Sequence, residues 1–359
     1  MARLLLKAGG ESAVVPAKFA GSLREESPVR VFAGRDLTRR DRIFNHLRSG
    51  GIAVLRGDEA ALDELSAYVK RKGTDTKPRS NSVLGRLMVA AKNGSCDGIN
   101  PPVRIPYLSE FCGEAVMPED QLFLIPLAAL RDLQNALEQK WQVRALDTWL
   151  LAGKDVILPR SQETVELFQE AIAARKLHLP DAARILDMGC GSGVLTLVAA
   201  VALKNLKPKI VATDILPEAI ASTRLNVGGF VSEGLVASDT VEVRKAGDLF
   251  EPVRDERFDL IILNAPWVVA PVGSRADISL NDPKQKMISR FFDDVRQYLN
   301  RKGRVVLGYA DNSGQRAVSR VLEMADGAGL SVLKERSVRI QTHRKKRKWQ
   351  RLYVWELGL

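Results

Sequence analysis

The chain has 359 residues, a length that predicts two domains, and its 45% hydrophobic content is typical of a globular protein. Its net charge of +11 favours an anionic partner, above all nucleic acid. No apolar run reaches the roughly 20 residues of a membrane span, and the N-terminal one is too short for a secretory signal, so we expect a cytoplasmic protein without a membrane partner. Three widely spaced cysteines and three isolated histidines exclude a disulfide framework and predict no metal site.

Residues 1–145 are predicted to form an N-terminal domain, α-rich or α+β, with a substrate-recognition or accessory role. A helix is expected over residues 38–47, and a loop rich in glycine and proline over residues 93–106. Residues 122–141 carry apolar residues at helical spacing and predict one amphipathic helix, after which we place the domain boundary. Four arginines gather near the first helix: Arg35, Arg39, Arg40 and Arg42.

Residues 146–359 alternate between strand-like and helix-like patterns. A helix over residues 161–176 has Ser161 as its expected N-cap. Strands are expected over residues 184–187, 210–214, 241–243, 258–263 and 304–309, and helices over residues 194–203, 217–227 and 286–299. This alternation predicts an α/β domain with a parallel sheet covered by helices on both faces. After a helix over residues 313–328, a hairpin of residues 331–340 and 351–357 brings in an antiparallel last strand, which is the topology of class I methyltransferases.

A glycine loop follows the first strand of this domain, with Gly189, Gly191 and Gly193 at alternate positions. Glycines let the chain turn tightly and bring a ligand close to main-chain N–H groups at the start of a helix. A dinucleotide fingerprint would need its third glycine at position 194, which is valine. Asp187, directly before the loop, would repel a pyrophosphate but suits the cationic amino acid moiety of S-adenosyl-L-methionine.

Two further acids follow the next two strands. Asp214 is placed to accept hydrogen bonds from both ribose hydroxyls, with a helix N-cap as the alternative role. Asp248 is placed to bind the adenine amino group, with Leu249 packing on the ring. Three acids after three successive strands predict a site for S-adenosyl-L-methionine.

The fourth strand runs into Asn264, Ala265, Pro266 and Trp267, which should face the methyl group because ligands of parallel sheets bind at the carboxyl ends of the strands. The Asn264 side-chain oxygen and the next carbonyl can hold an acceptor amine, and Trp267 offers a flat face for a planar amide or base. The alternative is a plain strand-to-loop turn with a buried tryptophan. The polar loop over residues 268–286 is expected to form a substrate lid.

With these residues in place, residues 145–359 resemble the N-methyltransferases that carry an Asn-Pro-Pro-Tyr motif, namely the HemK/PrmC-like glutamine methyltransferases and related small RNA methyltransferases. The likeness rests on residues 155–164, 187–193, 247–250 and 264–267. It implies further cofactor contacts from Thr164, Cys190, Ile215 and Asn264. Ala265 replaces the family's first proline and Trp267 its usual tyrosine or phenylalanine, which preserves nitrogen methylation but leaves the acceptor open.

The expected hairpin turn carries five consecutive basic residues: Arg344, Lys345, Lys346, Arg347 and Lys348. Beside the catalytic end of the sheet they would meet a nucleic acid or ribosomal target, or they simply keep the hairpin solvated. The sequence thus predicts N-methylation of an amide or exocyclic amine of rRNA, tRNA or a ribosome-associated protein. The alternatives are a small-molecule or peptide-tailoring enzyme, including one with non-methylating chemistry, and a protein that senses the cofactor without turnover.

Overall fold

The computed structural model describes residues 4–21, 23–74, 83–92, 95–104, 121–138, 140–153, 156–157, 161–175, 178–274, 276–344 and 347–359. The chain divides into two compact units, Met1–Ala136 and Leu137–Leu359, each of which is described by itself. None of the helices in the described ranges is both long and apolar enough to cross a membrane.

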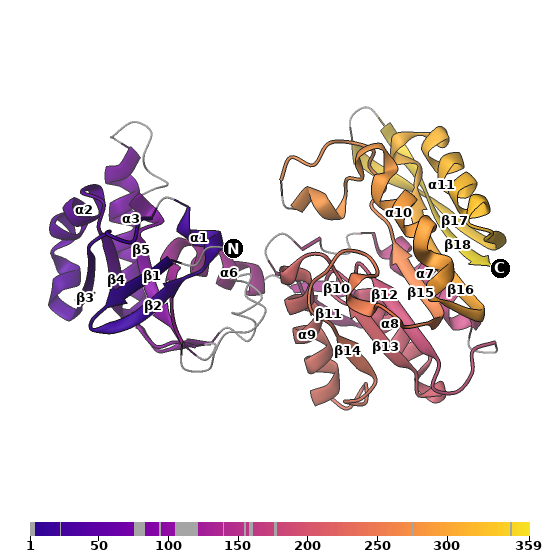
Figure 1. Ribbon diagram of the computed structural model, residues 1–359, viewed down its shortest axis with the longest axis horizontal. Helices are drawn as coiled ribbons and strands as arrows, with labels where there is room; N and C mark the ends of the chain where they lie inside the picture. Colours follow the sequence, from indigo (N-terminus) through magenta and orange to yellow (C-terminus); the bar gives the residue numbers. More distant parts are fainter. Residues whose placement is uncertain are drawn as a thin grey trace. The chain divides into compact units, whose positions relative to one another are not determined.

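Unit 1 is built on a mixed sheet with the strand order β1-β2-β9-β5-β4-β3, and β7 beside β4 (Figure 1). Its main strands are β1 (Leu4–Ala8), β2 (Glu11–Val15), β3 (Val29–Ala33), β4 (Ile52–Asp58), β5 (Leu87–Ala91), β7 (Ile99–Asn100) and β9 (Leu122–Pro126). Its helices are α1 (Ala17–Ala20), α2 (Arg40–Arg48), α3 (Glu59–Thr74) and α6 (Leu127–Glu138), with a 3-10 turn η1 (Gly34–Thr38) before α2. The parallel strands β3, β4 and β5 alternate with α2 and α3, as βαβ units do.

The single helix expected over residues 122–141 is wrong. Leu122–Pro126 forms β9, which lies between β2 and β5, and a helix begins only at Leu127. Phe123, Leu124 and Ile125 are all buried, as a strand covered on both faces requires. The loop expected over residues 93–106 contains three two-residue strands, β6 (Ser95–Cys96), β7 and β8 (Val103–Arg104), while residues 93–94 and 105–106 lie outside the described ranges.

Unit 2 begins with an antiparallel pair, β10 (Lys140–Val143) and β11 (Thr148–Leu151). Val143 and Leu150 from this pair join the hydrophobic core of unit 2. The division between the units therefore lies earlier than the predicted boundary at residue 145, because the residues just before that boundary pack with the core of unit 2.

The main sheet of unit 2 has the order β14-β13-β12-β15-β16-β18-β17. The strands are β12 (Arg184–Met188), β13 (Lys209–Thr213), β14 (Val241–Val243), β15 (Phe258–Asn264), β16 (Leu299–Ala310), β17 (Ser331–Arg344) and β18 (Arg347–Gly358). Strands β12 to β16 pair in parallel, whereas β18 is antiparallel to both β16 and β17. The predicted α/β architecture, a mostly parallel Rossmann-like sheet with an antiparallel last strand, is confirmed.

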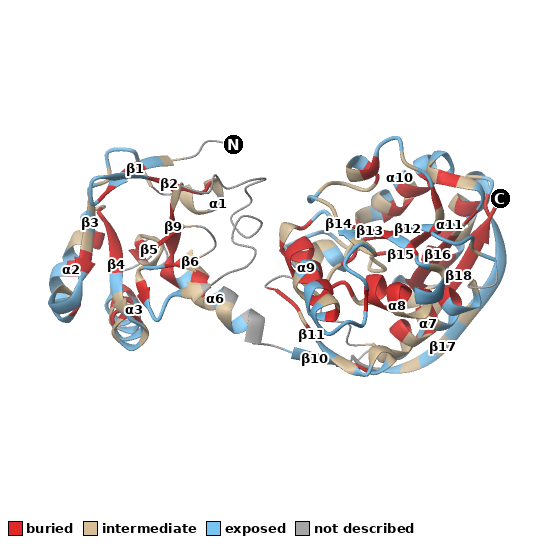
Figure 2. Cartoon of the chain, turned by 90° about the horizontal axis from the view of Figure 1, so that it is seen from below, coloured by how far each residue is buried: buried red, intermediate tan, exposed pale blue. Residues whose placement is uncertain are grey.

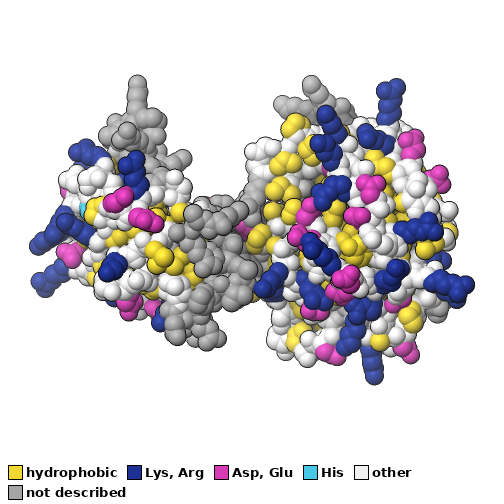
Figure 3. Space-filling view, in the orientation of Figure 1, with side chains coloured by type: hydrophobic (Ala, Val, Ile, Leu, Met, Phe, Trp, Pro, Cys, Tyr) yellow, Lys and Arg dark blue, Asp and Glu magenta, His cyan; other side chains and the backbone are white. Residues whose placement is uncertain are grey.

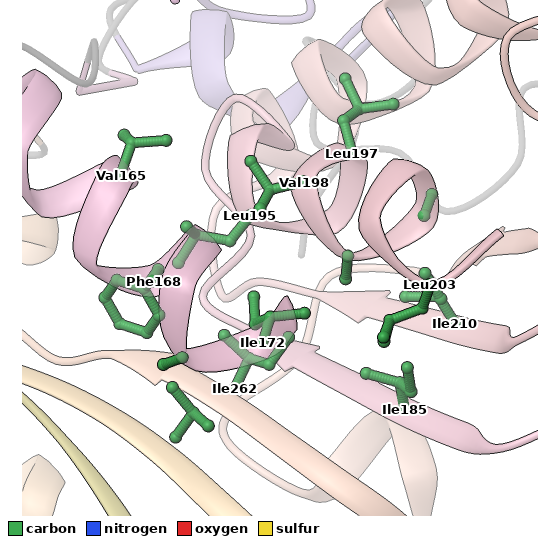
Figure 4. Close-up of a cluster of buried hydrophobic side chains, with 14 of the residues drawn as sticks. Val165, Phe168, Ile172, Ile185, Leu195, Leu197, Val198, Leu203, Ile210 and Ile262 are labelled. Atoms are coloured by element: carbon green, nitrogen blue, oxygen red, sulfur yellow. The ribbon is translucent and has the colours of Figure 1, made fainter. Parts of the chain in front are cut away.

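Helices cover both faces of this sheet, and Figure 2 shows the buried strands between them. The helices are α7 (Gln162–Arg175), α8 (Val194–Ala202), α9 (Pro217–Ser232), α10 (Lys286–Asp294) and α11 (Gln315–Gly327). Side chains of α7 and α8 meet Ile185, Ile210 and Ile262 in one cluster (Figure 4). The neighbouring strand residues Leu186 and Ile261 point to the other face and pack with α10 and α11. This strict alternation is what a strand buried on both faces produces.

Candidate functional site

The carboxyl ends of β12, β13 and β15 lie level with one another at one edge of the sheet. Met188 pairs with Thr213 on one side and with Leu263 on the other. Asp187, Asp214 and Asn264 therefore come from distant parts of the sequence to the same edge. This is where ligands of an open parallel sheet bind.

The glycine loop between β12 and α8 turns through left-handed backbone conformations. Gly189, Gly191 and Gly193 have φ angles of 74°, 57° and 81°, which glycine adopts without a steric penalty. A Cβ atom at Gly193 would lie 3.0 Å from the Thr223 side chain of α9, whereas Cβ atoms at Gly189 and Gly191 would meet nothing within 4 Å. The loop thus packs tightly against α9 and leaves open space beside its first two glycines.

Cys190, between the first two glycines of the loop, has a buried side chain. Its Sγ accepts a hydrogen bond from the Thr223 hydroxyl at 3.2 Å, and burial raises the pKa of the thiol. The main-chain N–H groups of Gly189 and Cys190 both donate to the carbonyl of Thr213, at 2.8 and 2.9 Å. These bonds fix the loop to the end of β13. Cys190 therefore contributes a packed side chain and main-chain contacts, not a reactive thiol.

Asp187 is only 1% exposed, and its carboxylate is half satisfied. The hydroxyl of Thr196 on α8 donates to Oδ2, while Oδ1 has no hydrogen-bond partner. Burial raises the pKa of Asp187 to about 7, the negative charge of Asp214 acts in the same direction, and the hydrogen bond from Thr196 opposes them. A buried carboxylate with a free oxygen and no counter-ion suits a cationic ligand.

Asp214 joins the glycine loop to the start of α9. Its two oxygens accept the N–H groups of Gly191, at 3.0 Å, and Leu216, at 2.8 Å. Burial raises its pKa, and the main-chain hydrogen bonds pull it back. The N-cap residue of α9 is Leu216, without a side-chain capping bond, so the capping role weighed as the alternative for Asp214 is wrong. Each oxygen keeps a lone pair for a ligand. Ile215, next in the chain, is 48% exposed and offers an apolar face beside the carboxylate.

Asp248 lies in the loop after β14 and forms an ion pair with Arg290 of α10, with 2.5 Å between Nη2 and Oδ2. The sequence did not predict this contact. The residues around Arg290 on α10 give no sign that its partner is Asp248, which lies 42 residues earlier in the chain. Leu249 has a φ of 49° and packs against the hydrophobic cluster that contains the buried side chains of α10. The loop is also joined to the carboxyl edge of the sheet, since the N–H of Gly247 donates to the carbonyl of Asp214 at 3.0 Å.

Asn264 ends β15 with its side-chain oxygen buried and without a hydrogen-bond partner. Opposite it in β16 lies Gly308, where a Cβ would come within 2.9 Å of that oxygen and 2.5 Å of the Phe168 ring. The space for the Asn264 side chain therefore depends on a glycine that the motif did not reveal. A glycine inside a strand is the signal that indicates such a close approach.

The rest of the tetrapeptide continues from Asn264 into the following loop. Ala265 is buried, and its N–H donates to the carbonyl of Gly308 at 3.2 Å. Pro266 and Trp267 are half-buried, and Trp267 packs against the clusters on both faces of the sheet. The loop then closes on itself, because Val268 exchanges main-chain hydrogen bonds with Leu280 and Asp282.

Thr164 lies on α7, where it is buried and its hydroxyl donates to Oγ of Ser161 at 2.9 Å. Ser161 also accepts the N–H of Thr164, which confirms it as the N-cap of α7. Thr164 precedes Phe168 by one helical turn, and Phe168 packs beside Asn264 and Gly308. The structure thus brings α7 to the part of the site that contains Asn264.

Two further hydroxyls at this edge were not predicted: Oγ of Ser192 and Oγ1 of Thr213 are buried without a hydrogen-bond partner, like the free oxygens of Asp187 and Asn264. Among the described residues, no group of three or more histidines, cysteines or acids is arranged to hold a metal ion. The site gathers unpaired polar atoms for an organic ligand.

The five basic residues of the predicted hairpin turn fall only partly within the described residues. Lys345 and Lys346 are outside the described residues, and for Arg344, Arg347 and Lys348 the structure describes only the backbone. Gln341 of β17 pairs with Trp349 of β18, beyond the pairing of Ala310 with Leu352. The turn therefore follows the carboxyl end of β16, on the same edge of the sheet as Asn264.

Residues 167–326 match the family model of the methyltransferase small domain. The chain is 34% identical over 113 residues to a release factor glutamine methyltransferase of Geobacter sulfurreducens, covering 32% of this chain and 34% of that protein. It is 40% identical over 87 residues to a ribosomal protein uL3 glutamine methyltransferase of Bradyrhizobium diazoefficiens, covering 24% and 25%. The chain thus spans about a third or less of the length of these two relatives. A precorrin-6y C5,15-methyltransferase structure from Geobacter metallireducens overlaps 58% of this chain and 92% of its own, with a TM-score of 0.39 and 18% identity.

Proposed function

We propose that the protein transfers a methyl group from S-adenosyl-L-methionine to an amide or exocyclic amine nitrogen of a macromolecule. The match of residues 167–326 to the family model of the methyltransferase small domain supports this proposal. The target is rRNA, tRNA or a glutamine of a ribosome-associated protein, which places the protein in the cytoplasm. The two relatives, whose names record glutamine methylation of a release factor and of a ribosomal protein, support an amide acceptor. The net charge of +11 supports an anionic target.

The residues at the carboxyl edge fit the proposed cofactor. The free oxygen of Asp187 would accept the ammonium group, and the open space beside Gly189 and Gly191 would admit the amino acid moiety close to the main chain. Asp214 would hold the ribose hydroxyls with its remaining lone pairs, and the exposed side chain of Ile215 would cover the adenine ring. When bound, the cofactor supplies an activated methyl group on a positively charged sulfur.

The observation that carries nitrogen methylation is the buried, unpartnered oxygen of Asn264. Leaving such an acceptor unpaired costs about 1–3 kcal/mol, and an incoming amide or amine N–H₂ group would satisfy it. A second hydrogen bond to the Ala265 carbonyl would fix the nitrogen in one orientation, while Trp267 covers the plane of the group. Holding the nitrogen toward the methyl group in this way lowers the entropic part of the barrier.

The proposal is tested with isotopically labelled S-adenosyl-L-methionine and fractionated cell extract, including purified ribosomes. The wild-type protein should label RNA or protein, and the Asn264→Ala protein provides the background. Label confined to the small-molecule fraction would replace the proposal with the tailoring enzyme considered from the sequence. Cofactor binding without any labelled product in any fraction would point to a sensor.

A further inference from the structure

One end of unit 1 carries an arginine surface that the methyl-transfer site does not use. Residues 29–48, which span β3, η1 and α2, contain six arginines and two aspartates, and no lysine. The arginine surface is defined here by the five of these arginines that are exposed: Arg30, Arg35, Arg39, Arg42 and Arg48. Figure 3 shows dark-blue side chains gathered at the end of unit 1 that carries β3 and α2.

The arginines are exposed because of the way α2 packs. The helix buries Ile43, Phe44 and Leu47 against the rest of unit 1 and turns its other side to solvent. Leu37 anchors η1 in the same manner. The surface therefore lies on elements that are anchored by buried side chains, and its arginines are spread over the segment that contains β3, η1 and α2.

Two of the neighbouring acids, Asp41 and Glu64, already have partners outside this surface. Asp41 accepts hydrogen bonds from Lys72, at 2.7 Å, and Tyr68, at 2.5 Å, which lower its pKa. Glu64 of α3 is paired with Arg40. Within the described ranges, no carboxylate forms an ion pair with any of the five arginines of the surface.

We propose that the arginine surface binds the phosphate backbone of helical RNA. Guanidinium groups present a planar fork that matches phosphate oxygens, and a segment with six arginines and no lysine favours such contacts. Binding to a membrane would need an apolar face beside the charges, and binding to single-stranded RNA would need exposed aromatic rings. The segment offers neither, since Phe32, Phe44 and its other large apolar side chains are buried or half-buried.

This inference goes beyond the proposed function, because RNA bound to unit 1 need not receive the methyl group. The surface would hold the enzyme on rRNA or tRNA whether the acceptor is a base or a glutamine of a nearby protein. Backbone contacts of this kind supply affinity without sequence choice.

The test uses the full chain and a fluorescent RNA duplex of about 16 base pairs, with anisotropy measured at several salt concentrations. The test variant is Arg35→Gln/Arg39→Gln/Arg42→Gln. The matched control is Arg301→Gln/Lys302→Gln/Arg320→Gln, which removes three exposed charges from unit 2. The test variant should bind about tenfold more weakly or worse near 0.1 M salt, and the slope of log affinity against log salt should fall by about two to three. The control should bind like the wild type.

Equal losses in both triple variants would overturn the inference, since the effect would then reflect overall charge. So would a wild-type protein that does not bind the duplex, or a test variant that loses binding only to phosphatidylserine vesicles. The single variant Arg42→Gln, with an expected slope change of about one, keeps the test open if the triple variant unfolds. Asn264→Ala should bind the duplex like the wild type, so that failure of methyl transfer and failure of RNA binding are separate results.

Discussion

At the scale of single residues, the site holds polar atoms that the fold itself leaves unpaired. Oδ1 of Asp187 and Oδ1 of Asn264 are both buried without a partner, at the ends of the adjacent strands β12 and β15. Each costs stability in the ligand-free protein, about 1–3 kcal/mol for a buried unsatisfied polar group. Each atom would be satisfied by a different proposed ligand, the ammonium group of the cofactor for Asp187 and the acceptor nitrogen for Asn264, so each leads to its own test.

Asn264→Ala should remove the proposed hydrogen bond to the acceptor nitrogen while leaving the other proposed cofactor residues in place. We expect turnover to fall by about 100-fold or more, because the nitrogen loses its orientation, with cofactor affinity close to that of the wild type. Single-turnover kinetics and calorimetry measure the two effects separately. Asn300→Ala is the control, since Asn300 donates to Asp259 at the opposite edge of the sheet and should leave turnover unchanged. A wild-type rate for Asn264→Ala would rule out the assigned role.

Asp187 should make cofactor binding depend on pH. Its pKa of about 7 means that the carboxyl group holds a proton below that pH in the ligand-free protein. A cationic ligand favours the ionised form, so affinity for S-adenosyl-L-methionine should rise with pH up to about 7, by at most about tenfold per pH unit, and level off above it. Titration calorimetry across about pH 5 to 8 measures this.

The control for this pH dependence is Asp187→Asn, which should bind more weakly and lose the contribution of this carboxyl group. Stability provides a second measurement. The pKa of Asp187 in the folded protein lies above the ordinary value of 3.8. Between about pH 4 and 7 the unfolded chain has therefore already lost this proton, whereas the folded protein still holds it, so the ligand-free wild-type protein should lose stability as pH rises through this range. Asp187→Asn should lack that decline. Parallel curves for the two proteins would contradict the assignment.

The sequence predicted the acids and the asparagine at the strand ends because each is adjacent to a recognisable strand. It could not predict Thr196 beside Asp187, Gly308 opposite Asn264 or Arg290 on Asp248, because these partners come from other elements. A pattern read along the chain finds the residues that a strand carries to its end. The partners that complete them are set by packing between distant segments.

At the scale of elements, helix α9 holds the glycine loop from one side, in addition to the main-chain bonds from β13. Asn226 of α9 donates to the carbonyls of Ser192, at 2.7 Å, and Leu151, at 2.8 Å, and accepts the N–H of Leu151. The same helix side presents Thr223 to Gly193. Helix α9 therefore ties the end of β11 and the glycine loop into one assembly.

Gly193→Ala should disrupt this contact. The substitution forces a left-handed alanine and places its Cβ 3.0 Å from Thr223, so unit 2 should lose about 2–3 kcal/mol of unfolding free energy. Gly228→Ala is the control, because Gly228 lies on α9 with nothing within 4 Å of a Cβ, and alanine there should stabilise by up to about 1 kcal/mol. Urea unfolding followed by tryptophan fluorescence measures both, and equal midpoints for the two variants would contradict the expectation.

The strands of the main sheet of unit 2 and the helices between them could be predicted because they alternate with clear breaks, whereas the pair β10 and β11 was not predicted. Residues 122–141 could not, because a short apolar run fits either a strand or a buried helix. What decides for β9 is its pairing with Val14 of β2 and Val89 of β5, far away in the chain. Nothing in the local spacing records those neighbours.

At the scale of the whole molecule, each unit has a hydrophobic core of its own. Scanning calorimetry should therefore resolve two transitions, of which S-adenosyl-L-methionine shifts only the one belonging to unit 2. At a ligand concentration about 100 times Kd the stabilisation is about 2.7 kcal/mol, which corresponds to about 5–10 °C for a unit of this size.

The chain supplies its own reporter for this experiment. All five tryptophans, Trp141, Trp149, Trp267, Trp349 and Trp355, lie in unit 2. The transition seen by tryptophan fluorescence should coincide with the one that the cofactor shifts, and the other should stay at its original temperature. A cofactor that moves both transitions equally would mean that the units unfold as one.

The order of strands in unit 2 also has a consequence for biosynthesis. Strand β16 leaves the ribosome before β17, yet its neighbour in the sheet is β18, which is made after both. Until β18 emerges, one side of β16 has unpaired N–H and C=O groups, and the pocket for the fully buried Trp355 stays empty. Such an open edge can pair with other nascent chains, so we expect this unit to be prone to aggregation until its last hairpin has been synthesised.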